Sequence, residues 1–396
     1  MLSNFLIKMY WRNTMREPLE VRIERRLQET GLPGVSFGVV AEDKLACCEA
    51  IGLADKATGE RLTNRHLLQA CSISKFVSAI IALCVAERYK VNMDADINNY
   101  LTSWYMPRTR RDGTGAEADT EAGAPPLKPV SLRSLLCHQA GLLDPDDSFD
   151  SLVPGESAPT LLEILGGQTR LLPQSVVPVS APYENFAYSD AGYCVIEQVL
   201  QDITGMSFTL LAEEFLFSPL GLGAFECRFE QPLRPPQPMQ PLKPLQTLQL
   251  DTASMPMAAK GHIPSGEVLA VGEPVYPYLA AAGLWCTASA YARILLEVIR
   301  AAEGRGKVLT PALVNDLFTE PGAKYIGLGN FSSGSAKNPF VYGLGWGKGF
   351  QCAFRLWLEE AFGCIVMINA NPGMEQSESL VGETTALLME EFDPGR

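Results

Sequence analysis

The sequence predicts an α+β fold in which an antiparallel sheet is flanked by helices and carries an inserted helical region. Strand-like segments stand near both ends of the chain, at residues 35–40 and 45–51 and again at residues 352–358 and 362–369. Between these ends, apolar residues recur at helical spacing instead. One sheet built from both ends of the chain accounts for this order.

The same order predicts the domain organisation. We expect a sheet domain with flanking helices from residues 1–62 and 258–396, and a mainly helical inserted region from residues 63–257. The polar stretch at residues 107–129 lacks apolar periodicity and is predicted to be an exposed loop. The Pro-rich stretch at residues 231–244 is predicted to be an extended connector between domains.

The predicted helices each have apolar residues three to four positions apart, as one buried helical face requires. They are residues 19–29, a segment that begins near Ser72 and continues through Val85, and residues 132–137, 190–204, 288–301 and 380–392. Short polar segments at residues 42–44 and 359–361 separate the two pairs of strands and suit hairpin turns.

The composition excludes several classes of partner. The chain has 396 residues, and its formal net charge of -13 argues against a nucleic-acid partner, which requires a basic face. No run of about 18 apolar residues indicates a membrane span, and residues 1–15 lack the pattern of a secretory signal. We therefore expect a cytoplasmic protein without stable membrane insertion, whose oligomeric state the sequence does not predict.

The ten cysteines are interpreted as free thiols in a reducing compartment. Several of them lie in apolar segments, no CxxC pair is present, and the chain has only three histidines. With no CxxC pair and only three histidines as possible ligands, the sequence predicts no zinc site, and we expect neither a metal nor a cofactor.

Ser72-Ile73-Ser74-Lys75 is the first candidate for chemistry. Positions three apart share a helix face, so the Ser72 hydroxyl and the Lys75 amine can lie within hydrogen-bonding reach. A serine needs a base to become a nucleophile, and a partly buried lysine loses some of its preference for the charged form. The alternative is structural, with Ser72 or Ser74 capping the first helical turn.

Tyr188-Ser189-Asp190 is the second candidate. A tyrosine just before a helix can relay protons if a cation holds its hydroxyl, and Asp190 stands where an N-cap is expected. The structural alternative is a packed tyrosine and a simple helix cap.

Together these motifs resemble the superfamily of class C β-lactamases, DD-peptidases and family VIII carboxylesterases, the penicillin-recognising serine hydrolases. Ser72-Ile73-Ser74-Lys75 resembles the nucleophile motif, and Tyr188-Ser189-Asp190 resembles the Tyr-x-Asn motif. Further matches are Gly34-Val35-Ser36, Gly52-Leu53-Ala54-Asp55, the segment at residues 135–142 and the segment at residues 282–287. The resemblance covers nearly the full length of the chain.

The resemblance implies a β-lactamase/transpeptidase-like fold and a mechanism. Ser72 would attack a carbonyl, Lys75 and Tyr188 would move the proton, and water would release the acyl group from the enzyme. The oxyanion hole would combine the Ser72 N–H with an N–H from a strand edge near the end of the chain. His138 lies in a structural turn of the family and is interpreted as a packing residue.

The third family motif, Lys-Thr-Gly or His-x-Gly, is absent. The corresponding region here is the stretch at residues 342–350. The best alignment puts Gly343 in the place of the cation, Gly345 on the motif glycine and Trp346 as oxyanion donor; the alternative is that a strand has been lost. Lys348 is interpreted as a solvated loop lysine rather than as a displaced cation.

Asp190 replaces the usual asparagine, so its carboxylate can only accept hydrogen bonds and favours the ammonium form of Lys75. A substrate-binding site with Asp190, Gly345 and Trp346 but no motif cation should bind carboxylate-bearing β-lactams and peptides poorly. We therefore expect an esterase of small or neutral esters, with a small-molecule ester or amide as its substrate. The alternatives are a β-lactamase or DD-peptidase-like hydrolase, and a catalytically impaired relative that binds a ligand.

Overall fold

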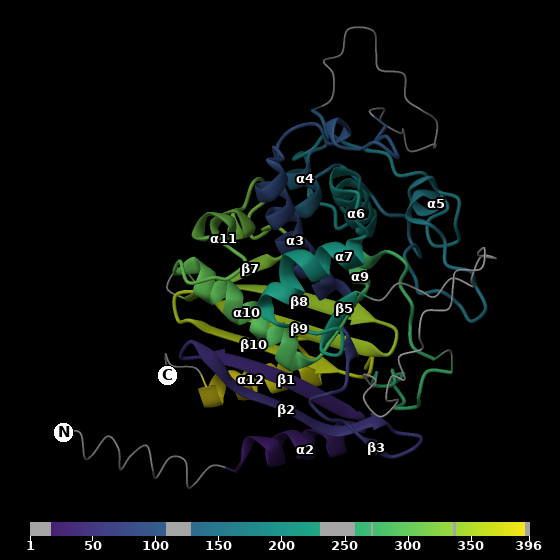
Figure 1. Ribbon diagram of the computed structural model, residues 1–396. Helices are drawn as coiled ribbons and strands as arrows, with labels where there is room; N and C mark the ends of the chain where they lie inside the picture. Colours follow the sequence, from purple (N-terminus) through teal and green to yellow (C-terminus); the bar gives the residue numbers. More distant parts are fainter. Residues whose placement is uncertain (1–16, 108–127, 230–257, 271, 336–337, 393–396) are drawn as a thin grey trace, which may run out of the picture.

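The computed structural model describes residues 17–107, 128–229, 258–270, 272–335 and 338–392 (Figure 1). The N-terminal segment, most of the loop expected at residues 107–129 and the connector expected at residues 231–244 lie outside the described residues. The described part contains no helix with the length and apolar character that a membrane crossing needs.

The centre of the fold is a seven-stranded antiparallel sheet in the order β3-β2-β1-β10-β9-β8-β7. Its strands are β1 (Gly34–Ala41), β2 (Lys44–Asp55), β3 (Glu60–Arg61), β7 (Phe331–Ser335), β8 (Asn338–Gly347), β9 (Phe350–Trp357) and β10 (Phe362–Ile368). β1 pairs directly with β10, with Val35 opposite Ile368. The prediction of one sheet made from both ends of the chain is therefore confirmed.

Helices cover both faces of this sheet (Figure 1). α2 (Leu19–Thr30) and α12 (Leu380–Phe392) pack against one face, and α10 (Ala288–Ala302) packs against the other, over β1, β2 and β10. Apolar side chains fill both layers: Ile23 and Leu388 belong to the core on the α2 and α12 side, and Ile294 belongs to the larger core on the other side. This arrangement confirms the predicted α+β class.

The larger core extends into a helical region beyond α10. Its elements are α3 (Ser74–Tyr89), α4 (Leu132–Leu136), α5 (Leu161–Leu165), α6 (Asp190–Thr204), α7 (Phe208–Ala212), α8 (Ser218–Leu220), α9 (Leu279–Ala282) and α11 (Pro311–Phe318). A small sheet in the order β4-β6-β5, with β4 (Leu68–Gln69), β6 (Leu284–Cys286) and β5 (Cys227–Phe229), lies beside them. The domain boundaries at residues 62 and 257 stay a prediction.

Two details differ from the expected elements. α3 begins at Ser74, two residues after Ser72, because residues 71–73 form a separate 3-10 turn. The stretch at residues 342–350 is divided between β8 and β9, which a tight turn at Lys348 and Gly349 joins. A strand is therefore present beside the expected nucleophile, and the alternative of a lost strand is wrong.

Candidate active site

Ser72 lies in the 3-10 turn at the start of α3, and its side chain is partly exposed. The residue before it, Cys71, has a φ of 49°, which a non-glycine residue rarely adopts. Ser74 holds this conformation, since its Oγ donates to Cys71 O at 2.6 Å and accepts from Leu284 N at 3.1 Å. The second serine of the motif therefore has a structural contact on both sides, and Ser72 is the one that faces outward.

Lys75 connects the members of the site. Its Nζ lies 3.3 Å from Ser72 Oγ, 2.9 Å from Ala281 O and 2.5 Å from Asp190 Oδ1, and only 2% of the residue is exposed. The Tyr188 ring centroid is 4.9 Å from the same Nζ. The structure thus brings Ser72, Lys75, Tyr188 and Asp190 together around one buried ammonium group.

The charge on Lys75 depends mainly on Asp190. Burial alone would lower the pKa of Lys75, but the Asp190 carboxylate and the Tyr188 hydroxyl outweigh burial and raise it above its ordinary value. Although 39% of Tyr188 is exposed, desolvation of its hydroxyl raises its pKa, while the charge of Lys75 and hydrogen bonds with Lys75 and Ser72 act in the opposite direction. At neutral pH the resting site therefore contains an ammonium at Lys75 and an un-ionised phenol at Tyr188.

The Tyr188 ring packs against the ring of His138, a residue that the sequence analysis assigned only to packing. The two rings stack at 4.4 Å between centroids, and His138 Nδ1 accepts from Ser189 N at 3.1 Å. Burial and the nearby Lys75 lower the pKa of His138 to about 3, so the imidazole is neutral and can serve as this acceptor. His138 thus packs against Tyr188 and fixes the backbone that follows it.

Asp144 is a site residue that the sequence analysis missed. Its carboxylate accepts from Ser189 Oγ at 2.7 Å, from Asp190 N at 2.5 Å and from Ala191 N at 3.4 Å. Burial and the neighbouring Asp190 raise the pKa of Asp144 to about 6. A carboxylate at the first turn of α6 satisfies N–H groups that have no helical partner, and it fixes Asp190 in front of Lys75. The only sequence signal was an acidic residue just after the Gly141-Leu142 segment.

The glycines of β8 bring that strand against the nucleophile turn. A Cβ on Gly345 would lie 2.6 Å from Ala70 O and 2.4 Å from Cys352 Sγ, so only glycine allows this approach. At Gly343 a Cβ would lie 2.4 Å from the Phe354 ring. Phe354 therefore occupies the space that a lysine or histidine at position 343 would need.

Trp346 can contribute only its backbone to the site. Side chains alternate between the faces of a strand; Gly345 and Gly347 face the nucleophile turn, so the Trp346 side chain, 40% exposed, lies on the other face. Gly347 and Phe350 close a two-residue hairpin, which directs the N–H of Trp346 away from β9. β7 pairs with β8 only as far as Tyr342. The Trp346 N–H therefore points to an uncovered strand edge.

Lys348 differs from the expected solvated lysine. Its Nζ lies 2.7 Å from Asp150 Oδ2, and the Tyr276 hydroxyl accepts from its backbone N–H at 3.0 Å. The pair joins the β8–β9 turn to the segment before α5, and each side chain is about 40% exposed. The ammonium of Lys348 is thus already neutralised by a partner within the protein.

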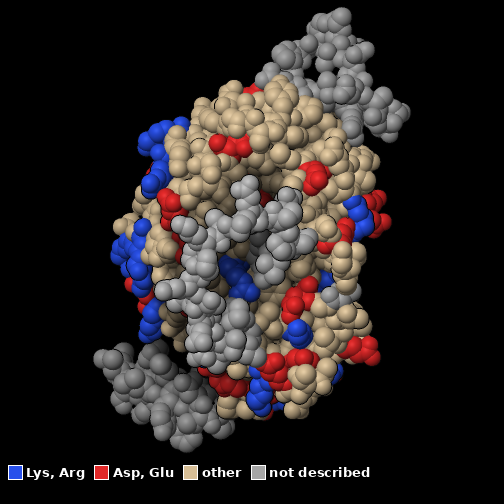
Figure 2. Space-filling view, turned by 45° about the vertical axis from the view of Figure 1, so that its right-hand side comes forward, with Lys and Arg blue, Asp and Glu red and all other residues tan. Residues whose placement is uncertain are grey.

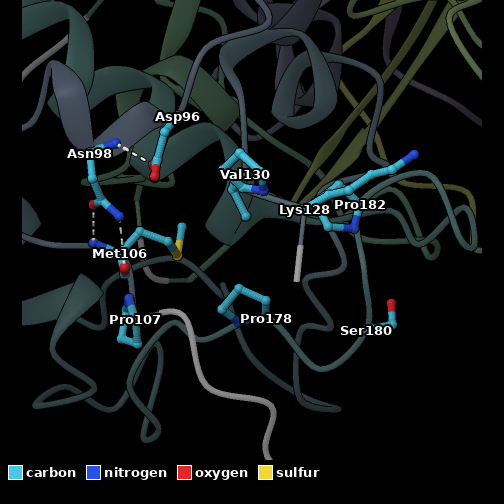
Figure 3. A pocket seen from close by; sticks show the side chains of 10 residues that line it. Asp96, Asn98, Met106, Pro107, Lys128, Val130, Pro178, Ser180 and Pro182 are labelled. Atoms are coloured by element: carbon cyan, nitrogen blue, oxygen red, sulfur yellow. Dashed lines mark hydrogen bonds between the residues drawn. The ribbon is translucent and has the colours of Figure 1, made fainter. Parts of the chain in front are cut away.

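Acidic and basic side chains are interspersed on the face drawn in Figure 2. A pocket elsewhere (Figure 3) is lined by Asp96, Asn98, Met106, Pro107, Lys128, Pro129, Val130, Pro178, Ser180 and Pro182. Asn98 bonds both the N–H and the carbonyl of Met106, at 2.8 and 3.0 Å, which is a structural role. None of the predicted site residues lines this pocket.

Solved structures with a similar fold include an amidase and a penicillin-binding protein homologue. The D-amino acid amidase from Ochrobactrum anthropi SV3 superposes with a TM-score of 0.69 at 18% identity, covering 96% of this chain and 98% of the amidase. An octameric penicillin-binding protein homologue from Pyrococcus abyssi superposes with a TM-score of 0.68 at 17% identity, covering 94% of this chain and 77% of the homologue. At these identities the likeness concerns the fold alone.

Sequence comparison identifies curated relatives and a family model. The teichoic acid D-alanine hydrolase of Staphylococcus aureus is 22% identical over 219 residues, which are 55% of this chain and 47% of that protein. The matched regions span only between a third and a half of the curated relatives' length. A model of the beta-lactamase family, however, matches residues 19–381. Since that match covers most of the chain and agrees with the fold, the chain belongs to the beta-lactamase family of serine hydrolases.

Proposed function

We propose that this protein is an esterase of small or neutral esters that acts through an acyl-enzyme on Ser72. The observation that carries the proposal is the position of Lys75 Nζ, 3.3 Å from Ser72 Oγ in a buried setting. A serine hydroxyl with an amine at this distance has the partner that nucleophilic catalysis requires.

The proposed reaction has two steps. Ser72 Oγ bonds to the ester carbonyl carbon while its proton passes to neutral Lys75, directly or through the Tyr188 hydroxyl, and Lys75 returns this proton to the alcohol as the ester C–O bond breaks. Water then attacks the acyl-enzyme and Ser72 recovers its proton, so that acid and alcohol are the only products. Lys75 must be neutral to accept the proton, and Asp190 Oδ1, 2.5 Å away, favours the ammonium form, so the fraction of neutral Lys75 limits the rate near neutral pH.

Two backbone N–H groups are proposed to stabilise the oxyanion. One belongs to Ser72 in the strained turn, and the other to Trp346 on the uncovered edge of β8. Preorganised donors of this kind stabilise developing negative charge without reorganisation and commonly contribute about 10²–10³ in rate. The steric need for Gly345 supports the pairing, because that glycine lets β8 approach the turn.

The preference for neutral substrates rests on the absence of an available cation. Among the described residues around Ser72, two lysines already have a carboxylate partner: Lys75 pairs with Asp190, and Lys348 pairs with Asp150. The space beside Gly343 is filled by the Phe354 ring.

A β-lactamase or DD-peptidase-like activity is the second candidate. The names of the relatives, an amidase and a D-alanine hydrolase, favour it, and the Ser72 chemistry would be the same. A substrate carboxylate, however, would have to displace Asp150 from Lys348. Because about 40% of each side chain in this pair is exposed, solvent screens the pair, and displacing Asp150 costs about 1 kcal/mol or less. Together with the missing motif cation, this leads us to expect weak or absent activity on carboxylate-bearing β-lactams.

The test compares kcat/KM for a short neutral ester, a matched ester with a terminal carboxylate, and a cephalosporin. We expect the neutral ester to be preferred, and Ser72→Ala to lose several orders of magnitude, whereas Ser103→Ala, at an exposed serine away from the site, retains activity. Efficient cephalosporin cleavage that Lys348→Ala alone abolishes would reject the esterase preference. No Ser72-dependent turnover of any substrate would favour the binding relative.

A further inference from the structure

Glu197 is a buried carboxyl group on α6 that the proposed mechanism does not use. It lies seven residues after Asp190, on the same face of that helix. Only 5% of the residue is exposed, and none of the described lysines or arginines forms an ion pair with it. Burying a carboxyl group without a cation costs folding free energy, so its contacts need an explanation.

Glu197 binds the first turn of α9. Its Oε2 accepts from Ala280 N at 2.9 Å, and the N–H of Leu279 also donates to this carboxyl. α9 is a single turn, Leu279–Ala282, and the N–H groups at the start of such a turn have no partner within it. Glu197 supplies the partners that α9 itself cannot.

The other end of α9 contacts the nucleophile helix and the strand before it. Ser78 Oγ donates to Ala280 O at 2.8 Å, Lys75 Nζ donates to Ala281 O at 2.9 Å, and Gln69 Nε2 donates to Ala282 O. Three successive carbonyls of this turn are therefore bound by α3 and β4. α9 is a rigid connection that runs from the Glu197 carboxyl to the Lys75 amine.

We propose that Glu197 is a positioning residue for Lys75: it holds α9 so that Ala281 O keeps Lys75 Nζ directed at Ser72 Oγ. The inference rests on the proposed function. Without Glu197 the N–H groups of α9 lose their acceptor and the turn shifts. Lys75 then retains Asp190 as its strong partner and loses the hydrogen bond that Ala281 O accepts. A misplacement of about 1 Å can cost about 10²-fold in rate.

The chain provides a matched control in Glu297 on α10. It is also buried, at 3% exposed, and it also accepts backbone N–H groups, from Lys307, Val308 and Leu309 at 3.0, 2.7 and 3.1 Å. These contacts hold the loop after α10 and do not involve Ser72 or Lys75. Glu297→Ala therefore reproduces the loss of a buried carboxyl that caps N–H groups, without touching the connection to Lys75.

The experiment measures, at equal concentrations of folded protein, the rate of Ser72 labelling by a fluorophosphonate and kcat for a neutral ester against pH. We expect Glu197→Ala to lower both rates by about 10–100-fold with little change in KM. The acidic limb of the kcat–pH profile of Glu197→Ala should move to lower pH, because the Lys75 ammonium loses Ala281 O as an acceptor and its pKa falls. Glu197→Gln keeps an acceptor oxygen and should retain most activity.

Comparison with Glu297→Ala decides the inference. If Glu197→Ala and Glu297→Ala have equal activity and equal pH profiles, the positioning role is wrong. Should Glu197→Ala fail to fold, Glu197→Asp, whose carboxyl is withdrawn by one methylene, serves instead: an unchanged kcat and pH limb would contradict the proposal. Failure of the proposed function would look different, because wild-type protein itself would then show no labelling at Ser72.

Discussion

Asp190 is the clearest departure of this site from the Tyr-x-Asn motif, which has an asparagine at the same position. Its carboxylate lies 2.5 Å from Lys75 Nζ, and it also raises the pKa of Asp144. A carboxylate beside a buried amine stabilises the ammonium form. Asp190 thus determines how much of Lys75 is neutral at a given pH.

The first prediction concerns Asp190→Asn. The wild-type pKa of Lys75 is raised, so the neutral amine appears only at high pH. Removing the carboxylate lowers that pKa, and the acidic limb of kcat/KM for a neutral ester should move to lower pH by one unit or more, roughly 1.4 kcal/mol per unit. Activity near pH 7 should then rise. An unmoved limb would mean that Lys75 is not the group whose deprotonation limits the reaction.

At this scale the sequence predicted the residue types but not all of their contacts. Ser72 and Lys75 are three residues apart, so helical geometry alone places them near each other. The approach of Tyr188 came from the resemblance to the family. Asp144 and the stacking of His138 on Tyr188 depend on how two loops meet, which no local pattern in the sequence specifies.

At the scale of elements, β8 is the strand that completes the site. Its alternate glycines face Phe354, Ala70 and Cys71, so the strand lies unusually close to the nucleophile turn. Glycine weakens a strand in isolation, and only two of the ten β8 residues are fully buried. This explains why apolar alternation did not reveal β7 and β8, whereas the buried strands β1, β9 and β10 were predicted within one or two residues.

The second prediction follows from this close approach. In Gly345→Ala the new methyl would lie 2.6 Å from the backbone oxygen of Ala70, so the turn that carries Ser72 must move. We expect a loss of about 1–3 kcal/mol in the free energy of unfolding and a fall in kcat of at least tenfold. Gly223→Ala is the control, since nothing lies within 4 Å of its Cβ position. Equal behaviour of the two variants in urea unfolding and turnover would contradict the assigned contact.

The third prediction concerns Glu197 on α6. Burial raises the pKa of Glu197 from 4.5 to about 8, although backbone N–H groups oppose this. Between these values the folded state holds a proton that the unfolded state releases, so stability falls as pH rises. Wild type should lose up to about 1.4 kcal/mol per pH unit in this window relative to Glu197→Gln. Thermal unfolding at pH 5 and pH 8 measures the difference, and a constant difference would contradict it.

The helix boundaries predicted from the sequence agree with the observed ones for some helices and not for others. α6 and α12 were predicted at their observed bounds, but the N-cap of α6 is Ser189 and not Asp190, which the sequence analysis expected there. α3 begins two residues late, since the strained conformation of Cys71 places Ser72 in a separate turn. α9 was not predicted because a run of three alanines has no amphipathic pattern; contacts from α6 and α3 hold it in place.

At the scale of the whole molecule, the fold closes by pairing the two ends of the chain. β1 and β10 are more than 300 residues apart in sequence and lie side by side at the centre of the sheet. The strand-like segments at both ends predicted this pairing, and the family resemblance supplied the architecture between them. The extent of the inserted region could not be fixed, since its expected connector lies outside the described residues.

The fourth prediction uses the net charge of the molecule. A formal charge of -13 repels anionic substrates over a distance that depends on salt, with a Debye length of about 10 Å at 0.1 M. Raising the salt concentration from about 0.02 to 0.5 M should therefore increase kcat/KM for a carboxylate-bearing ester by severalfold and leave a matched neutral ester nearly unchanged. An equal response of both esters would argue against charge exclusion.

The central claim is that Ser72 is an acyl-forming nucleophile. The most direct measurement is the intact mass of the protein after incubation with a fluorophosphonate, followed by peptide mapping of the modified residue. The account predicts one phosphonyl adduct per chain, located on Ser72, absent in Ser72→Ala and formed much more slowly in Lys75→Ala. An unmodified wild-type protein, or an adduct on a different residue that persists in Ser72→Ala, would contradict it.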